Sequence, residues 1–302
     1  GTYITTPSVN EKFAKVNVRT KVVLPEGADP AKYSVETSVW NPNKQKLTAV
    51  RTSLAQMKYN NNQAEQEFVI QDPSLWSPEM PALYSAETRL YEGDKLKDTY
   101  TTPFGIRSIE IIPDKGFFLN GKRTVFKGVC NHHDLGPLGA AVNDAAIRRQ
   151  IRILKDMGCN AIRTSHNMPA PELIRACDEM GMMIMAESFD EWNVAKCKNG
   201  YNLLFDEWAE KDLVNLLHNF RNNPSVVMWC IGNEVPNQWN EGDCKIAKWL
   251  QDICHREDPT RPVTQGMDAP DAVVNNNMAA VMDVAGFNSV SYTHLRAHET
   301  VL

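Results

Sequence analysis

An apolar run that ends in an amide and a carboxylate constrains this chain more than any other feature. Residues 225–232 (SVVMWCIG) carry no charge, and Asn233 and Glu234 follow them directly. Such a run is typical of a β-strand that is buried on both faces in a parallel sheet. Asn233 and Glu234 would then stand at the carboxyl end of the strand, where catalytic groups gather in parallel α/β barrels. An alternative in which Glu234 only caps the next element fits so apolar a strand less well.

Glu234 has the setting of a general acid. A carboxyl group at the end of an apolar strand is partly removed from water, which favours its protonated form near neutral pH. The adjacent Asn233 offers a neutral donor and acceptor that suit a sugar hydroxyl. Cleavage of a glycosidic bond also requires a second carboxylate across the scissile bond. The pair therefore suits glycoside chemistry, and Glu234 and Asn233 are the candidate catalytic residues.

Two regions of the chain differ in the secondary-structure pattern that their sequences predict. From Lys15 to about Ile112, short alternating segments rich in Val, Thr and Tyr predict an antiparallel β-sandwich. After Phe117 strands and helices take turns, which predicts parallel strand pairing. We expect strands at 124–129, 160–163, 182–187, 226–231, 263–265 and 284–287, and helices at 144–157, 171–180, 206–219 and 243–257. A closed barrel of this kind has eight strands, two more than the sequence provides.

Polar residues after the first three barrel strands form a candidate site. They are Asn131, His132, His133 and Asp134, then Arg163, Ser165, His166 and Asn167, and finally Glu187, Asp190, Glu191 and Trp192. Neighbouring side chains on an extended strand point to opposite sides, so His132 and His133 cannot easily share a metal ion. We therefore expect His132 and His166 to bind sugar hydroxyls, with a core histidine as the alternative for each. Trp192 is expected to form an apolar platform for a sugar face, with packing at the rim as the alternative.

Five motifs resemble glycoside hydrolase family 2, which contains β-galactosidases, β-glucuronidases and β-mannosidases. In the family's order they are LWSPEMPALY (75–84), FGIR (104–107), FFLNGKRTVFKGVCNHHD (117–134), NAIRTSHNMP (160–169) and NPSVVMWCIGNE (223–234). The resemblance runs from about residue 1 to residue 288, and GVCNHHDLGPLGAA is most similar to the β-galactosidase branch. It implies an immunoglobulin-like β-sandwich over residues 1–113, followed by an incomplete TIM (β/α)8 barrel over residues 114–288.

The resemblance also implies a function. The chain is expected to be a fragment of a retaining exo-β-glycosidase that hydrolyses terminal β-linked sugars, with β-galactosidase as the first expectation. Glu234 would act as general acid and then general base, and Asn233 would bind the sugar 2-hydroxyl. Arg163 would brace the catalytic carboxylates, and it joins Glu187 among the expected substrate-binding residues. Open alternatives are a β-glucuronidase or β-mannosidase, a non-catalytic carbohydrate-binding or structural fragment, and an unrelated barrel isomerase that uses Glu234 as a base.

The end of the chain departs from the family. Residues 289–302 (SVSYTHLRAHETVL) show none of its motifs, so we expect a disordered tail that is foreign to the family. The nucleophilic glutamate of the family lies on the seventh strand, and Glu299 has no motif around it that would assign it this role. The sequence therefore predicts that the nucleophile is absent and that the fragment alone is inactive.

Some family members hold Mg²⁺ with the acid/base glutamate together with a Glu and a His after the third strand. Glu191 stands at the position of that Glu, but Asn193 stands where the His is expected. An Asn oxygen is an acceptable ligand for a hard cation. Without the His, no metal or other cofactor is predicted.

Composition and charge limit the classes of partner that this chain is expected to bind. A chain of 302 residues with 42% hydrophobic content is long enough for two globular domains. Its net charge of −5 and its dispersed Lys and Arg residues give no reason to expect nucleic acid as a partner, and no segment reaches the apolar length of a membrane span. The seven cysteines form no disulfide pattern. The chain begins without Met or a signal peptide, so the compartment stays open between periplasm and cytoplasm, as does the oligomeric state.

Overall fold

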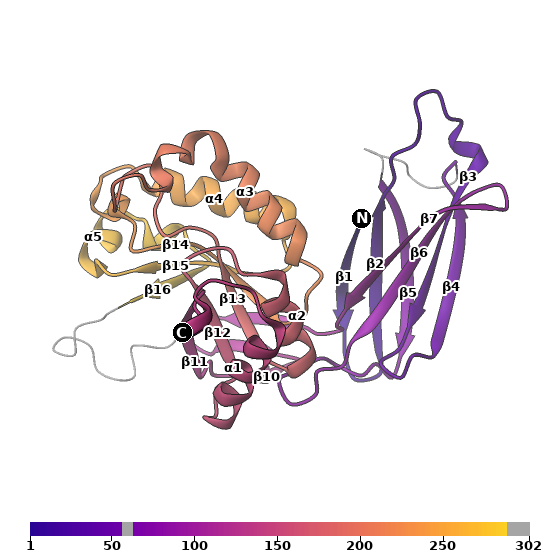
Figure 1. Cartoon of the computed structure of the whole chain (residues 1–302), viewed down its shortest axis with the longest axis horizontal. Coiled ribbons are helices and arrows are strands. Elements are labelled where there is room, and N and C mark those ends of the chain that lie inside the picture. The colour runs from indigo at the N-terminus through magenta and orange to yellow at the C-terminus, as the bar shows by residue number, and fades with distance from the viewer. Residues whose placement is uncertain (56–62, 289–302) are drawn as a thin grey trace. The chain divides into compact units, whose positions relative to one another are not determined.

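The computed structural model describes residues 1–55 and 63–288, so the tail expected at 289–302 lies outside the described residues. The chain divides into two compact units (Figure 1). The first holds Gly1–Ser108 together with Arg221–Pro224, and the second holds Ile109–Phe220 and the residues from Ser225 onward.

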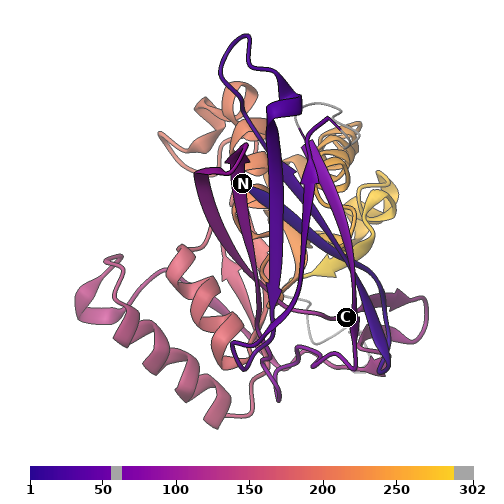
Figure 2. The same ribbon diagram turned by 90° about the vertical axis from the view of Figure 1, so that its right-hand side faces the viewer.

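The first unit is a β-sandwich of two antiparallel sheets, with strand orders β1-β2-β5 and β4-β3-β6-β7 (Figure 2). Its elements are β1 (Thr2–Val9), β2 (Phe13–Lys21), η1 (Pro30–Lys32), β3 (Tyr33–Trp40), β4 (Lys46–Ser53), β5 (Gln63–Gln71), β6 (Tyr84–Glu92) and β7 (Lys95–Phe104). Buried and exposed residues alternate along β2 and β5, because successive side chains of a strand point to opposite faces. Val16 and Phe68 from one sheet and Tyr84 and Phe104 from the other share one core.

Residues outside the strands complete this unit. Trp76 is wholly buried, and its backbone N–H donates to the carbonyl of Ile106 at 2.8 Å. Asn222 belongs to the same unit, where its Oδ1 accepts from the Ile4 backbone N–H at 2.8 Å. Arg107 is also buried, and its Nε donates to the carbonyl of Pro224 at 2.6 Å. These contacts explain why residues 221–224 group with the sandwich.

The second unit starts with a small antiparallel sheet, ordered β10-β9-β8, and continues with six parallel strands in chain order from β11 to β16. The strands are β8 (Ile109–Ile112), β9 (Gly116–Leu119), β10 (Lys122–Arg123), β11 (Gly128–His132), β12 (Ala161–Ser165), β13 (Met183–Glu187), β14 (Val226–Asn233), β15 (Val263–Met267) and β16 (Val284–Phe287). Parallel strands in sequential order are the arrangement of a (β/α)8 barrel. The predicted fold class, a β-sandwich followed by a partial TIM barrel, is confirmed.

Helices pack on one face of the parallel sheet. They are η2 (Gly136–Leu138), α1 (Asp144–Asp156), α2 (Pro171–Met180), η3 (Tyr201–Leu203), α3 (Phe205–Phe220), η4 (Pro236–Trp239), α4 (Cys244–Glu257), α5 (Pro270–Asn275) and η5 (Ala279–Val281). Asn143 caps α1 by accepting from the Ala146 N–H. The helix α2 starts on Pro171 and ends before Gly181, whose φ of 74° suits a left-handed cap. Their apolar faces form one core with the outward side chains of the sheet.

Three details differ from the sequence prediction. The first barrel strand is Gly128–His132 and not 124–129. Its pairing with β12 begins with Gly128 opposite Ala161. A side chain at position 128 would collide with the Ala161 carbonyl, so this pairing requires glycine. The six-residue helix α5 was not predicted, since so short an element shows no helical period. The expected domain boundary after residue 113 falls in the turn between β8 and β9, within the second unit.

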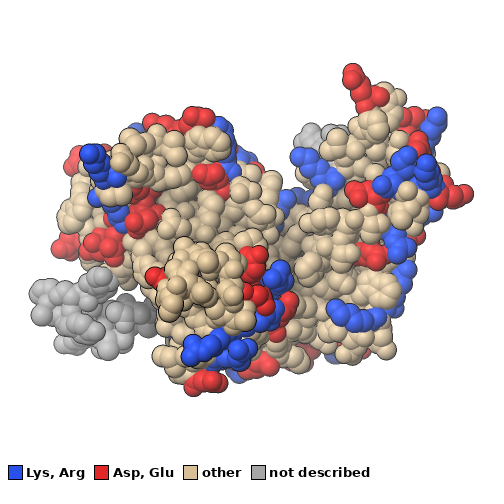
Figure 3. Space-filling view, viewed as in Figure 1, with Lys and Arg blue, Asp and Glu red and all other residues tan. Residues whose placement is uncertain are grey.

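Charges of both signs are interspersed on the face shown in Figure 3. Several charged side chains of the described residues form surface ion pairs, such as Arg148 with Asp144 and Lys211 with Glu207. Among the helices of the described residues, none has the length and apolar character needed to cross a membrane.

Candidate active site

Glu234 stands at the carboxyl end of β14, a strand whose eight residues are all buried. Its backbone has a φ of 44°, in the left-handed region, and its N–H donates to the carbonyl of Gly266 on β15 at 2.7 Å. A non-glycine residue in this conformation costs about 1–3 kcal/mol, and such residues cluster at functional sites. The turn brings the half-buried Glu234 side chain to the rim of the sheet.

Asn288, which follows β16, holds the Glu234 carboxylate. Its Nδ2 donates to Glu234 Oε1 at 3.0 Å and to Asn233 Oδ1 at 2.8 Å. Its Oδ1 accepts from Arg163 Nη1 at 3.1 Å, and because Arg can only donate, this contact fixes the orientation of the amide. Sequence reasoning missed Asn288, although a polar residue directly after an apolar strand is the signal that identified Asn233.

Arg163 is the centre of the network. Its Nε pairs with Glu187, and its Nη2 donates to Asn233 Oδ1 at 2.9 Å. Burial alone would lower the pKa of Arg163, but nearby Cys230 and Glu187 outweigh it and raise the pKa above the usual range. The guanidinium therefore stays charged. Gly266 makes room for it, because a Cβ there would collide with the guanidinium.

Glu187 lies behind the rim and is not available to a substrate. Its side chain is 0% exposed, one carboxylate oxygen pairs with Arg163, and the other lies 2.8 Å from His166 Nδ1. Its backbone N–H donates to Thr164 Oγ1 at 2.9 Å. The predicted direct binding of substrate by Glu187 is therefore wrong, because its carboxylate is used to orient Arg163 and His166. Arg163 likewise braces the two amides beside Glu234, and does not contact Glu234 itself.

The structure brings His132 and His166 together. Their ring centroids lie 5.0 Å apart, and the rings meet edge to face at 89°. The His132 side chain is exposed, and that of His166 is 21% exposed, so both offer ring atoms to a ligand. The peptide bond between Ser165 and His166 is cis. Binding of sugar hydroxyls by these rings stays a prediction.

Asp190 and Lys196 hold Asn233 from the other side. Asn233 Nδ2 donates to Asp190 Oδ1 at 3.0 Å, and Lys196 Nζ donates to the same oxygen at 2.9 Å and to the Asn233 carbonyl at 2.6 Å. Partial burial raises the pKa of Asp190, but the hydrogen bonds from Lys196 and Asn233 lower it below the usual value. One N–H of Asn233 Nδ2 donates to Asp190, and no hydrogen bond among the described residues uses the second, which remains for a ligand. Lys196 gave no sequence signal, because it lies in a charged loop.

Trp192 is a core residue. Its side chain is 0% exposed, and its Nε1 donates to the carbonyl of Ile231 at 2.9 Å. The indole packs on Gly232, where a Cβ would lie 3.0 Å from the Trp192 Nε1. The predicted sugar platform is therefore wrong, because the missing side chain of Gly232 leaves a space in the core that the indole fills.

Glu191 organises the loop after β13. Its Oε2 accepts from the Lys196 backbone N–H at 2.6 Å, and its Oε1 accepts from the Asn202 backbone N–H at 2.9 Å. The Oδ1 of Asn193 accepts from Asn237 Nδ2 at 2.8 Å. Within residues 1–55 and 63–288, no group of three or more His, Cys, Asp or Glu side chains is arranged to hold a metal ion. In this structure the Glu191 and Asn193 oxygens accept hydrogen bonds from the protein itself.

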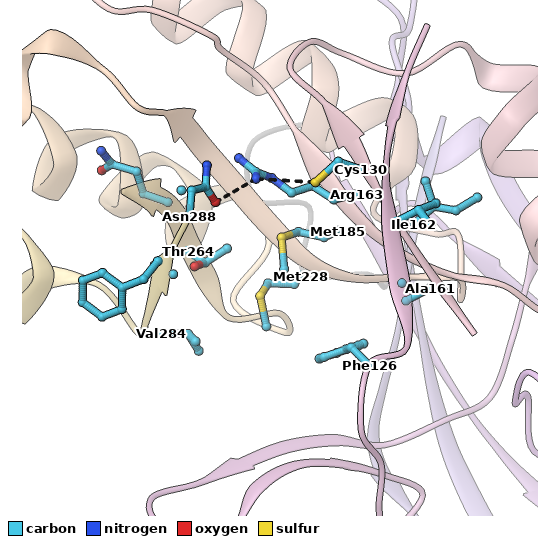
Figure 4. Close-up of a pocket in the computed structure, with 16 residues that line it drawn as sticks. Phe126, Cys130, Ala161, Ile162, Arg163, Met185, Met228, Thr264, Val284 and Asn288 are labelled. Atoms are coloured by element: carbon cyan, nitrogen blue, oxygen red, sulfur yellow. Dashed lines mark hydrogen bonds between the residues drawn. The ribbon is translucent and has the colours of Figure 1, made fainter. Parts of the chain in front are cut away.

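A cavity of about 370 Å³ lies on the inner face of the parallel sheet, with lining residues from each of β11 to β16. Figure 4 shows Met185 and Met228 in its wall, with Arg163 and Asn288 joined by a hydrogen bond above them. Apolar side chains of this kind fill the interior of a TIM barrel. The cavity is therefore the barrel interior, and the polar network at its edge is the candidate site.

Comparisons with known proteins agree with this arrangement. The model of the TIM barrel domain of "Glycosyl hydrolases family 2" matches residues 110–300, and a second model, "Glycosyl hydrolases family 2", matches residues 2–107. Beta-galactosidase BoGH2A of Bacteroides ovatus is 38% identical over 319 residues, which cover 95% of this chain and 37% of that protein. A putative beta-glucuronidase of Formosa agariphila is 34% identical over 292 residues, covering 96% of this chain and 26% of that protein.

Solved structures give the same result. A crystal structure of a glycosyl hydrolase family 2 member from Bacteroides cellulosilyticus has a TM-score of 0.85 and 35% sequence identity, and the match covers 96% of this chain and 37% of that one. Bacteroides uniformis beta-glucuronidase 2, covalently bound to cyclophellitol-6-carboxylate aziridine, has a TM-score of 0.77 and 25% identity. The chain spans between about a quarter and two fifths of the length of these relatives.

Proposed function

Because the chain belongs to glycoside hydrolase family 2, we propose that it carries the acid/base half of a retaining, exo-acting β-glycosidase site. The complete enzyme hydrolyses terminal β-linked sugars. One observation carries the proposal: the half-buried Glu234 directly follows a fully buried strand, and its carboxylate accepts a hydrogen bond from the neutral amide of Asn288.

A neutral partner suits a group that must change its protonation state. In the first step, Glu234 gives its proton to the glycosidic oxygen while a second carboxylate attacks the anomeric carbon and the leaving group departs. In the second step, Glu234 takes a proton from the water that attacks the glycosyl-enzyme, which releases the sugar and the nucleophile. The N–H of Asn288 binds Oε1 in both states, so Oε2 is free to carry the proton.

We place the second carboxylate outside the described residues. A retaining enzyme needs its two carboxyl groups about 5–5.5 Å apart across the bond that is cleaved. Three other acidic residues of this region are already committed to the protein. Glu187 is buried against Arg163 and His166, Glu191 binds two backbone N–H groups, and Asp190 is bound by Lys196 and Asn233.

The substrates we propose are β-galactosides. The relative named beta-galactosidase is 38% identical to this chain, and the one named putative beta-glucuronidase is 34% identical. A glucuronide carries a carboxylate, which calls for a cation in the sugar pocket. Among the described residues of the network, the two cations, Arg163 and Lys196, are already paired with Glu187 and Asp190. This pairing favours a neutral sugar.

Azide trapping in the complete enzyme tests the role of Glu234. In a Glu234→Ala variant, the glycosyl-enzyme forms from an activated aryl β-galactoside but lacks a base for water, so azide should compete and give β-galactosyl azide with retained configuration. A Glu191→Gln variant is the matched control, because it alters a carboxylate of the neighbouring loop, and it should give no azide product. Absence of the adduct in Glu234→Ala would remove Glu234 from the acid/base role, and saccharide binding without any turnover in the unmodified enzyme would favour a binding module.

A further inference from the structure

A second hollow lies on the same rim as Glu234. It has a volume of about 490 Å³, and its lining includes Trp239, Glu241 and Gly242 after β14, and Asn275, Asn276 and Asn277 at the end of α5. We call these six residues the Trp239 groove. The Trp239 side chain is 68% exposed. None of these residues belongs to the network that holds Glu234.

Gln238 ties the two sides of the groove together. Its carbonyl accepts from Asn276 Nδ2 at 2.8 Å, and its Oε1 accepts from the backbone N–H groups of Asp268 and Ala269, each at 3.2 Å. The groove is therefore built from two loops that follow the neighbouring parallel strands β14 and β15. The carboxyl ends of parallel strands meet at one rim, so the groove shares the rim with Glu234.

The groove lies within reach of a ligand that is held at Glu234. Trp239 comes five residues after Glu234 and ends the 3-10 helix η4. Five residues span at most about 18 Å even when fully extended, and a 3-10 helix rises only about 2 Å per residue. A short oligosaccharide could therefore touch both.

The groove has the chemistry of a saccharide subsite. Single exposed apolar side chains are common, but here a flat aromatic ring stands in a hollow that asparagine side chains also line, together with Ala272 and Cys244. The side chains of Asn275 and Asn277 are exposed and make no hydrogen bond to another of the described residues. Amides donate to and accept from hydroxyls, and an aromatic face packs against the apolar face of a sugar ring. The carboxylate of Glu241 adds an acceptor and disfavours an acidic ligand.

We propose that the Trp239 groove binds the leaving-group side of the substrate, and that this leaving group is a neutral saccharide. The inference rests on the proposed glycosidase function and narrows its substrate class to glycosides of neutral oligosaccharides. Trp239 supplies the platform, and Asn275 and Asn277 bind hydroxyls of the leaving-group sugar.

Saturation-transfer NMR on the 302-residue chain tests the groove without requiring turnover. Lactose is the probe, because it joins a β-galactosyl ring to a neutral glucose ring. Saturation should reach the glucose-ring protons in the unmodified chain, and Trp239→Ala should weaken lactose binding by roughly two- to tenfold, as expected for loss of one aromatic contact. Trp208→Ala is the matched control, since it removes another partly exposed tryptophan, which lies on α3, and it should leave the signal unchanged.

Three results would overturn the proposal. They are an equal glucose-ring signal in Trp239→Ala, a signal confined to the galactose ring, and no lactose signal from a chain that circular dichroism shows to be folded. Glu234→Gln should keep the glucose-ring signal, because Glu234 does not line the groove. A failure of the groove and a failure of the acid/base assignment are therefore separate results.

Discussion

Asn288 Nδ2 lies 3.0 Å from Glu234 Oε1, and this contact joins the residue after β16 to the residue after β14. The two strands are not neighbours, because β15 lies between them. Asn288 also forms hydrogen bonds with Asn233 and Arg163, so one amide connects the proposed acid to both of these residues. The position of Glu234 therefore depends on the last described strand of the sheet.

Replacement of Asn288 by Ala in the complete enzyme should lower kcat for an aryl β-galactoside by about tenfold or more. A hydrogen bond to a charged group contributes about 1.5–3 kcal/mol, and its loss frees the Glu234 side chain. Steady-state kinetics measure the effect, and Asn43→Ala, an exposed asparagine of the sandwich, is the control. A kcat equal to that of the control would show that Asn288 does not position Glu234.

Glu187→Ala should destabilise the second unit by about 3–5 kcal/mol, because it leaves the Arg163 guanidinium buried without a counter-charge. Urea unfolding of the 302-residue chain measures the change. Glu179→Ala, which removes an exposed partner of Arg148, serves as the control and should cost about 1 kcal/mol or less. Equal losses from the two substitutions would contradict the buried pairing described for Arg163.

Trp192→Ala should act on stability and not on sugar recognition. Loss of a wholly buried tryptophan typically costs about 3–5 kcal/mol, and Trp192 has no exposed surface to offer a ligand. Thermal unfolding and the inhibition constant of a monosaccharide product in the complete enzyme are the two measurements. A variant that unfolds like the parent but binds the sugar more weakly would restore the platform role.

The Asp190 carboxylate should stabilise the folded chain at neutral pH and lose this effect in acid. Its pKa lies below the ordinary value in the folded chain, so its stabilisation is fully present above the unfolded pKa of about 3.9 and is lost as the pH falls through the folded pKa. Because the side chain is 45% exposed, this stabilisation should be about 1 kcal/mol or less. Urea midpoints between pH 6 and pH 2 should fall less steeply for Asp190→Asn, and identical slopes would contradict the Lys196–Asp190–Asn233 arrangement.

Much of the fold could be predicted from local patterns. The strand at 226–233 is apolar throughout, and the helix at 171–180 carries Pro at its start and Gly after its end, so both were found within two residues. The first barrel strand was misplaced by several residues, because its position depends on the pairing of Gly128 with Ala161. The pairing of residues that are far apart in the chain cannot be predicted from the local sequence.

The site was predictable in its location and less so in its details. Polar residues after buried strands gave Asn233, Glu234, Arg163 and His166, which the structure gathers at one rim. The roles of Glu187 and Trp192 depend on burial, and burial depends on partners distant in sequence, such as Arg163 and Gly232. Asn288 has the same sequence signal as Asn233, because it is a polar residue directly after an apolar strand.

The leaving-group dependence of Glu234→Gln in the complete enzyme tests the central claim most directly. Gln keeps the shape but has no proton to give, so kcat/KM for alkyl β-galactosides and lactose should fall by about a hundred- to ten-thousandfold. For dinitrophenyl β-galactoside, whose leaving group needs no proton, it should fall far less. That divergence is the result predicted for a general acid. Equal, small losses for both substrate types would contradict the assignment of Glu234 and, with it, this account of the site.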